Sequence, residues 1–403
     1  MEEQSKYAFG IDVGTENVRA VALEIKGNDS ISVIGYGDAK NEGGMRKGIV
    51  TNLAGPAAAT DQALKNVEGM SGVNVDSAYV SINGSHITSE KMNGMIAVSS
   101  AQGITNDDLD RLEDTAMSGR ITENRSVLDV VPLNYTLDGQ SGIRSPLGMT
   151  ANKIELSANV VSGLRPSVDA LGKAMAAANL NPLRFVPTAA AAARAVLTEK
   201  QMENGVCVID FGSSTTSIAV YDEGDLQYVG VVNAGANNIT KDLAISLELN
   251  TEAAELIKLK HVTAEFVDSP REISMKVDGE NILFDKREVN KIVKERLVDI
   301  FEHVNEQLQR AGYAQKLPEG AVIVGAGANM KGLAPFAKEV LKMATRIGVP
   351  GANMSGLVES VEKPEYATAI GLALLMADDG CVGGADEKEK KKGFSLFGFL
   401  KKK

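Results

Sequence analysis

One pattern occurs twice in this chain, as Phe9-Gly-Ile-Asp-Val-Gly-Thr-Glu-Asn-Val-Arg-Ala-Val-Ala-Leu23 and, with its Asp 198 residues further on, as Val206-Cys-Val-Ile-Asp-Phe-Gly-Ser-Ser-Thr-Thr-Ser-Ile-Ala-Val220. In each copy, an apolar run that favours a β-strand ends in Asp. A turn rich in glycine and hydroxyl residues then leads into a second apolar run. Each copy therefore predicts a β-hairpin whose turn can bring backbone N–H groups close to an anion.

Two such turns in one chain suggest a duplicated α/β fold that clamps a phosphate chain between its halves. Asp12 and Asp210 end the first strand of each hairpin. They would then face each other across the phosphates. Carboxylates in this position can hold a hydrated Mg²⁺ through its waters.

The composition narrows the class of protein. A chain of 403 residues with 44% hydrophobic residues is expected to form two or more soluble domains. Two cysteines, Cys207 and Cys381, imply no disulfide framework, and the three histidines lack metal-ligand spacing. We find no N-terminal signal peptide and no apolar run of about 18 residues that could span a bilayer.

The charge is unevenly distributed. The net charge of −11 argues against nucleic acid as the main partner. Residues 386–403 carry seven Lys against three acidic residues, a net charge of +4, so the rest of the chain carries −15. A basic tail on an acidic body suggests that the tail meets an anionic surface.

The first part of the chain predicts a β-rich lobe with an insertion. After the hairpin at 7–23, we expect a strand at 31–36, a helix at 53–70 and a strand at 78–82. From 85 to 163 the pattern changes to short alternating strands around one helix, 106–117, with Asn106 as its N-cap. This pattern predicts a small inserted α+β domain.

Helices dominate the rest of the chain, apart from the second hairpin and one further strand. We expect that strand and a glycine-rich turn at Ala321-Val-Ile-Val-Gly-Ala-Gly-Ala-Asn329, and a linker at 378–393. The Ala-rich run at 189–195 predicts a closely packed helix rather than a site. The expected helices are 166–179, 187–198, 237–249, 251–260, 287–311 and 366–376.

The two hairpins and the turn at 325–329 together resemble the nucleotide signature of the actin/Hsp70/sugar-kinase superfamily, whose fold is a duplicated ribonuclease H-like one. They match its first phosphate loop, second phosphate loop and adenosine loop. Residues 46–50, 79–84, 236–243 and 365–372 further resemble FtsA, the family of bacterial cell-division actin homologues. The resemblance covers about residues 7–376 and the tail.

The resemblance implies a first actin-like lobe formed by residues 1–84 and 164–204, with an inserted α+β interaction domain at 85–163. The second actin-like lobe would comprise 205–236 and 313–377, and its outer subdomain 237–312. A linker at 378–393 would lead to an amphipathic membrane-targeting helix at 394–403.

The resemblance also implies ligands, ATP and Mg, and the residues that bind them. Asp12 and Asp210 would hold the Mg through water. The phosphates would lie among Gly14, Thr15, Glu16 and Asn17 on one side and Gly212, Ser213, Ser214 and Thr215 on the other. The adenosine would contact Gly325, Gly327 and Ala328, and its ribose and base would approach Glu255 and Lys258.

The sequence departs from the family pattern in two places. Ser213 and Ser214 replace two glycines of the second loop, and Ser217 replaces an acid. Val186 stands where superfamily members that hydrolyse well often carry an acid. Without a residue to orient water, in-line attack is expected to be slow. We therefore expect ATP to act in conformation and assembly, with weak hydrolysis at most, and we assign no catalytic residue.

The C-terminal residues predict a membrane-binding helix. Large apolar residues gather at 394–400, and lysines lie on both sides. Such a helix is too short to span a bilayer but can lie in the headgroup region, with its charges on anionic lipid. The residues expected at the membrane are Phe394, Leu396, Phe397, Phe399, Leu400, Lys401, Lys402 and Lys403.

The resemblance implies an ATP-binding protein that polymerises on the cytoplasmic face of the membrane at the division site. It would anchor the tubulin-like division protein FtsZ through the C-terminal peptide of FtsZ, recruit later division proteins and bind no nucleic acid. Two alternatives stay open: an actin-like adaptor of a pilus-assembly complex, and a small-molecule kinase of the same superfamily. The rod-shaping actin homologue is a weaker match because it lacks the inserted domain.

Overall fold

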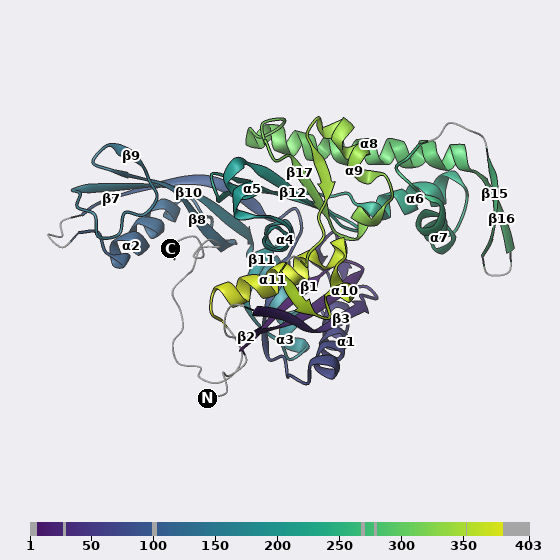
Figure 1. The fold of residues 1–403 in the computed structure, drawn as a ribbon, viewed down its shortest axis with the longest axis horizontal. Helices are drawn as coiled ribbons and strands as arrows, with labels where there is room; N and C mark the ends of the chain where they lie inside the picture. The colour runs from purple at the N-terminus through teal and green to yellow at the C-terminus, as the bar shows by residue number, and fades with distance from the viewer. Residues whose placement is uncertain are drawn as a thin grey trace.

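The computed structural model describes residues 6–26, 30–98, 103–266, 271–277, 280–351 and 353–381. Two central sheets form a first and a second lobe (Figure 1). An inserted domain lies at one end of the molecule, around β7–β10, and an outer subdomain lies at the other end, around α6–α8. The fold is a duplicated α/β fold, as expected from the two hairpins.

The first lobe is built on a six-stranded sheet in the order β11-β6-β1-β2-β3-β19. β1 and β2 pair antiparallel, with Val13 opposite Val18, and β1 pairs in parallel with β6. The strands are β1 Lys6–Val13, β2 Asn17–Lys26, β3 Ser30–Lys40, β6 Ser77–Ile82, β11 Asn181–Pro187 and β19 Met354–Gly356, with a small separate pair, β4 Met45–Arg46 and β5 Ile49–Val50.

The second lobe repeats this arrangement in a five-stranded sheet, β14-β13-β12-β17-β18. β12 pairs antiparallel with β13, with Phe211 opposite Thr216, and in parallel with β17. A hairpin flanked by a parallel strand therefore occurs in both lobes. The strands are β12 Val206–Phe211, β13 Thr216–Asp222, β14 Asp225–Val232, β17 Ala321–Val324 and β18 Thr345–Ile347.

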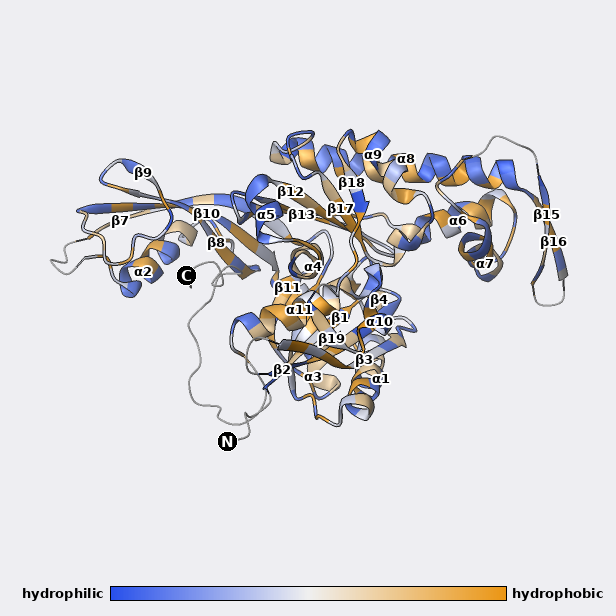
Figure 2. Ribbon diagram, in the orientation of Figure 1, coloured by the Kyte–Doolittle hydropathy of each residue, from blue (hydrophilic) through white to orange (hydrophobic). Residues whose placement is uncertain are grey.

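Two helices join the lobes, α4 (Thr188–Val196) and α11 (Ala367–Asp378). α11 packs on β1 and β6, α4 packs on β12 and β13, and the two helices contact each other. They approach so closely that a Cβ on Gly371 would lie 1.8 Å from the carbonyl oxygen of Ala191. All alanines from 189 to 193 are fully buried, which confirms the expected close packing, and α11 is strongly apolar (Figure 2).

The inserted domain is a four-stranded sheet, β7-β10-β8-β9, covered by α2 (Asn106–Met117). Its strands are β7 Thr88–Ala97, β8 Arg125–Leu137, β9 Gln140–Ile143 and β10 Lys153–Leu164. The N-cap of α2 is Thr105, so our assignment of the cap to Asn106 was wrong by one residue. Thr105 and Asp108 each accept a hydrogen bond from the other's backbone N–H, which forms a capping box.

The outer subdomain combines α6 (Ala236–Ser246), α7 (Thr251–His261) and the 26-residue α8 (Lys286–Ala311) with a hairpin, β15 (Glu272–Val277) and β16 (Glu280–Asp285). α8 alternates apolar and polar residues along its length (Figure 2). The apolar residues that α8 buries run from Val289 to Leu308. The alternation therefore places one face of α8 in the core and the other in solvent.

The remaining described elements are α1 Ala54–Ser71, α3 Arg165–Ala177, α5 Glu199–Asn204, η1 Ala326–Asn329, α9 Leu333–Leu341, α10 Val358–Val361 and η2 Pro364–Tyr366. Within the described ranges, no helix is both long and apolar enough to cross a bilayer. The expected membrane helix, 394–403, and most of the linker at 378–393 lie outside the described residues.

Candidate nucleotide site

The turns of the two hairpins have the same backbone geometry. The N–H of Gly14 donates to the carbonyl of Asn17 at 3.0 Å, and the N–H of Gly212 donates to the carbonyl of Thr215 at 3.0 Å. Glycine is needed in the first turn because a Cβ on Gly14 would lie 2.6 Å from the Asn17 oxygen. The sequence repeat thus corresponds to a structural repeat at the level of single hydrogen bonds.

The two turns line one cavity between the lobes, with a volume of about 90 Å³. Asp12 and Asp210 both line it, as expected from their positions at the strand ends. The other predicted site residues that line it are Gly14, Thr15, Glu16, Asn17, Gly212, Ser213, Thr215 and Gly325.

Five predicted residues do not line the cavity: Ser214, Glu255, Lys258, Gly327 and Ala328. Glu255 and Lys258 form an ion pair at 2.7 Å, and both bond to the Thr240 hydroxyl, at 2.5 and 2.9 Å. Gly327 packs against the Phe211 ring, which a Cβ would meet at 2.5 Å, and Ala328 is buried. In this conformation, α7 therefore uses these two charged residues to bind α6.

The structure adds lining residues that we did not assign: Val13, Arg19, Gly48, Asn83, Thr188, Ala326, Glu365 and Thr368. Gly48, Asn83 and Glu365 belong to the sequence stretches that carry the family resemblance, so those stretches held a signal for them. Thr368, the second residue of α11, also lies in one of those stretches, whereas Thr188 begins α4 and reaches the cavity only through the packing of that helix.

The two cavity carboxyls are costly to ionise. Burial raises the pKa of Asp12, although the Ser81 hydroxyl, which donates to it at 2.8 Å, opposes the shift. Burial first, and the negative charge of Asp12 second, raise the pKa of Asp210 to about 7. A cation between these carboxylates would remove both causes, since it screens their repulsion and replaces lost solvation.

The residues present fit a hydrated Mg²⁺. The Thr188 hydroxyl is buried beside the carboxyls and interacts with Asp210, where it opposes the upward shift of the Asp210 pKa. Within that same part, no cluster of three or more acidic, His or Cys side chains could hold a metal directly. Asp12, Asp210 and Thr188 would therefore hold the ion through its waters, and the ion would neutralise phosphate charge.

We expect the metal-free protein to lose stability as the pH rises from about 4 to about 7. The folded pKa of Asp210, about 7, lies above its ordinary value of 3.8, so the folded chain keeps a proton that the unfolded chain releases. This contribution, up to about 4 kcal/mol, is complete below pH 4 and is lost as the pH passes about 7. Thermal melts in EDTA across this range measure it.

The control for that prediction is Asp210→Asn, which should lose much of the slope between pH 4 and 7. Added Mg²⁺ should also reduce the slope in the unsubstituted protein. If the Asn variant kept the same pH dependence, the buried pair would not be its source.

Asn83 joins the lobes across the cavity. Its amide donates to the Thr215 hydroxyl at 3.0 Å, and its oxygen accepts from the Ser217 hydroxyl at 2.9 Å. Ser217, which replaces the family's acid, thus bonds to the opposite lobe. Sites for small molecules commonly measure about 300–1,000 Å³. The cavity of about 90 Å³ is smaller than this range and is not lined by most of the residues expected to contact the adenosine, so we expect the lobes to separate when a nucleoside triphosphate enters.

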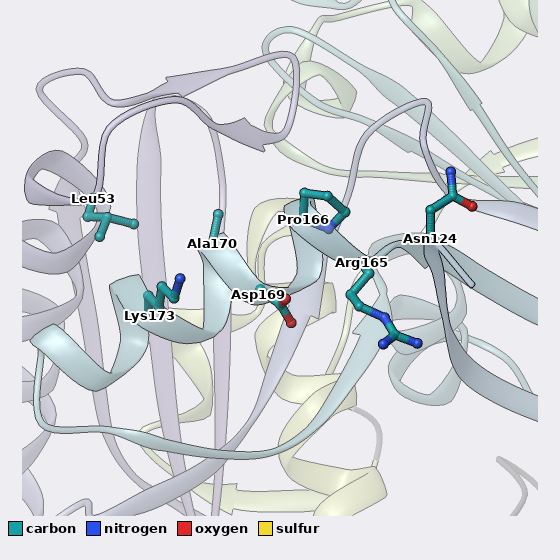
Figure 3. Close-up of a pocket in the computed structure, with 7 residues that line it drawn as sticks. All are labelled: Leu53, Asn124, Arg165, Pro166, Asp169, Ala170 and Lys173. Atoms are coloured by element: carbon teal, nitrogen blue, oxygen red, sulfur yellow. The ribbon is translucent and has the colours of Figure 1, made fainter. Parts of the chain in front are cut away.

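A second depression, of about 530 Å³, opens at the start of α3 (Figure 3). Its lining includes the exposed Arg165, Asp169 and Lys173, whose charged ends point in different directions. None of the predicted site residues lines it. We therefore place the candidate nucleotide site in the smaller cavity, where the two hairpin turns and the buried carboxyls converge.

Comparison with known proteins identifies the family. The profile of cell division protein FtsA matches residues 207–371, and that of the SHS2 domain inserted in FtsA matches residues 84–162. FtsA of Neisseria meningitidis serogroup B is 33% identical over 388 residues, which cover 92% of this chain and 90% of the relative. This chain belongs to the FtsA family of cell-division proteins. FtsA of Escherichia coli K12 is 29% identical and covers 98% of the chain and 96% of the relative.

Solved structures share the fold at lower identity. A chain of a PilM–PilN type IV pilus biogenesis complex superposes with a TM-score of 0.67 at 16% identity, covering 91% of this chain and 97% of that one. MreB5 of Spiroplasma citri bound to ADP superposes with a TM-score of 0.54 at 11% identity, and the match covers 92% of this chain and 96% of that one. A chain of a MamK double helical filament superposes with a TM-score of 0.52 at 14% identity, and the match covers 92% of this chain and 98% of that one. These similarities establish the actin-like fold.

Proposed function

We propose that this protein binds Mg-ATP between its lobes, polymerises on the cytoplasmic face of the membrane and anchors the division ring there. The observation that carries the nucleotide proposal is the meeting of two equivalent glycine turns and two buried carboxyls in one cavity. Fold neighbours in the solved structures carry ADP or AMPPNP, which supports the same ligand class here. We keep the predicted site residues and domain boundaries as part of this proposal.

Hydrolysis is proposed to be weak. The position at which an acid often stands in this superfamily is Val186, and its side chain is fully buried in β11. A buried valine can neither accept a proton from water nor orient it. ATP would then act mainly by changing how the lobes close, and therefore how subunits assemble.

We propose that FtsZ docks its C-terminal peptide on the outer subdomain, and that the inserted domain meets neighbouring subunits and later division proteins. The outer subdomain exposes three large apolar side chains, Ile245, Leu259 and Leu283, at 77%, 70% and 63%. Burial of these side chains against a partner would contribute to its binding. The tail at 394–403 would hold the assembly on anionic lipid.

Membership of a cell-division family favours this function over the alternatives. The similarity to a pilus-complex chain is one of fold, at 16% identity, whereas the cell-division relatives reach 29–33% over nearly the whole chain. A kinase would also need a base in a substrate cleft, and we have assigned none.

Vesicle pelleting tests the proposed function. Full-length protein should pellet with vesicles that contain anionic phospholipid, and electron microscopy should show filaments on them when Mg-ATP is present. Neutral vesicles serve as the control. Pelleting without filaments under every nucleotide condition would contradict assembly. Robust phosphoryl transfer from ATP to a sugar or acid would favour the kinase.

A further inference from the structure

The inserted domain is part of the first lobe in sequence, yet it packs on the second lobe. β14 of the second lobe contacts β7, β8 and β10 of the inserted domain. At this contact Asn159, on β10, is fully buried. Its amide donates to the carbonyl of Leu226 on β14 at 2.9 Å, while its oxygen accepts from the Ser89 hydroxyl at 2.6 Å. Asn159 therefore bonds the inserted domain to the second lobe.

Apolar and charged groups support this contact. Val131 and Val161 of the inserted domain share one hydrophobic core with Leu226 and Val229 of β14, and all four are at most 2% exposed. At the rim, Arg144 lies 3.4 Å from the carboxylate of Asp225. The contact is therefore a buried interface with a polar rim.

The inserted domain is also tied firmly to the first lobe. Arg184, on β11 of the first lobe, donates to the carboxylate of Asp129 on β8 at 2.8 Å, and the backbone N–H of Arg165, at the start of α3, donates to the carbonyl of Asn124 at 2.8 Å. His86 lies three residues after Asn83, the residue that crosses the phosphate cavity. The inserted domain is thus fixed to the first lobe around its two connections, near residues 84 and 164, which we call its neck. It is fixed to the second lobe at β14.

We propose that the inserted domain is a brace that keeps the phosphate cleft closed, and that Asn159 is the positioning residue of this brace. The proposal rests on the proposed nucleotide function. Separation of the lobes must either break the Asn159–Leu226 bond or tilt the inserted domain on its neck. We expect nucleotide entry to need such a separation, because the closed cavity is smaller than common small-molecule sites. The brace therefore opposes nucleotide binding, and a partner that tilts the inserted domain would promote it.

Asn159→Ala should weaken the brace and raise the open fraction of the protein. Apparent affinity scales with that fraction. The expected result is about tenfold faster association and tighter binding of a fluorescent ATP analogue, the change that corresponds to one lost buried hydrogen bond. Asn159→Asp should act in the same direction at pH 8, since it keeps the acceptor for Ser89 and loses the donor to Leu226.

The matched control is Asn134→Ala. Asn134 lies on β8 of the same domain, and its oxygen accepts a hydrogen bond from the N–H of Gly142. This bond lies within the inserted domain and does not reach the second lobe. This variant should bind the analogue like the unsubstituted protein. Equal kinetics in the Asn159 and Asn134 variants would overturn the brace.

Hydrogen exchange without nucleotide separates the two proposals. The amide of Gly84 donates to the oxygen of Asn83, whose side chain bonds to Thr215 and Ser217 across the cleft. It should exchange faster in both Asn159 variants and at the ordinary rate in Asn134→Ala. Amides of α2 report whether the inserted domain stays folded. Unchanged exchange at Gly84 would reject the brace whatever the nucleotide result. If the unsubstituted protein failed to bind ATP while Gly84 still responded, the nucleotide proposal would be rejected and the brace retained.

Discussion

Asp210→Ala is expected to weaken Mg-ATP binding about ten- to a hundredfold and to leave the fold intact. Asp210 lines the cavity, and the charge of Asp12 and burial both act on its carboxyl. Removing it takes away one of the two carboxylates proposed to hold the metal waters, a loss on the scale of a hydrogen bond to a charged group, about 1.5–3 kcal/mol. Equilibrium titration with a fluorescent ATP analogue, with and without Mg²⁺, measures the change.

The same substitution should not lower the melting temperature in EDTA at pH 8. Above its folded pKa of about 7 the buried carboxyl is ionised and unfavourable, so its removal relieves a cost. Asp61→Ala is the matched control, because Asp61 is an acid on the surface of α1 that pairs only with Lys65 in the described contacts. If both variants bound the analogue equally well, Asp210 would have no part in the site.

Deletion of residues 394–403 is expected to abolish binding to anionic vesicles, with a loss of at least a hundredfold. The segment holds five large apolar residues and three lysines. Burying each large apolar side chain contributes about 1.5–3 kcal/mol, and each lysine near an anionic surface contributes about 1 kcal/mol. Co-sedimentation with vesicles of graded anionic lipid content measures the loss.

Two variants separate the apolar from the charged contribution. Phe397→Ser together with Leu400→Ser should remove most binding at any salt concentration. Alanine at Lys401, Lys402 and Lys403 should weaken binding mainly at low salt, because charge screening acts only on the electrostatic part. If the variant that lacks residues 394–403 still sedimented with vesicles, the tail would be excluded as the membrane anchor.

The site residues could be predicted from the sequence where a local pattern carries the chemistry. Asp12 and Asp210 were placed correctly in one cavity because a strand-end acid before a glycine turn is a short-range feature, repeated at both ends of the same fold. Glu255 and Lys258 could be placed only by resemblance. In the structure they bond to each other and to Thr240, since a helix position alone does not say which way a long side chain will bond.

Asn83 and Asn159 illustrate what one-dimensional patterns miss. Asn83 bonds to residues 132 and 134 positions away, and Asn159 to one 67 positions away. Asn83 lies in the stretch 79–84 that resembles the family, but no local pattern predicts its bonds to the second lobe. Asn159 lies in none of the stretches or repeats identified in the sequence. Both sit at boundaries between lobes, and only the packing of separate domains creates such boundaries.

By itself, the order of residues determined the duplicated hairpins, the packed alanine helix and the insertion, because turn chemistry and hydrophobic periodicity act over a few neighbouring residues. The membrane-binding tail stays a prediction of the sequence. Only the tertiary structure decided that the cleft is closed to about 90 Å³, that Asn83 bridges it and that the inserted domain rests on β14. Those features depend on how rigid elements distant in sequence meet, and burial and hydrogen bonding across the lobes settle that geometry.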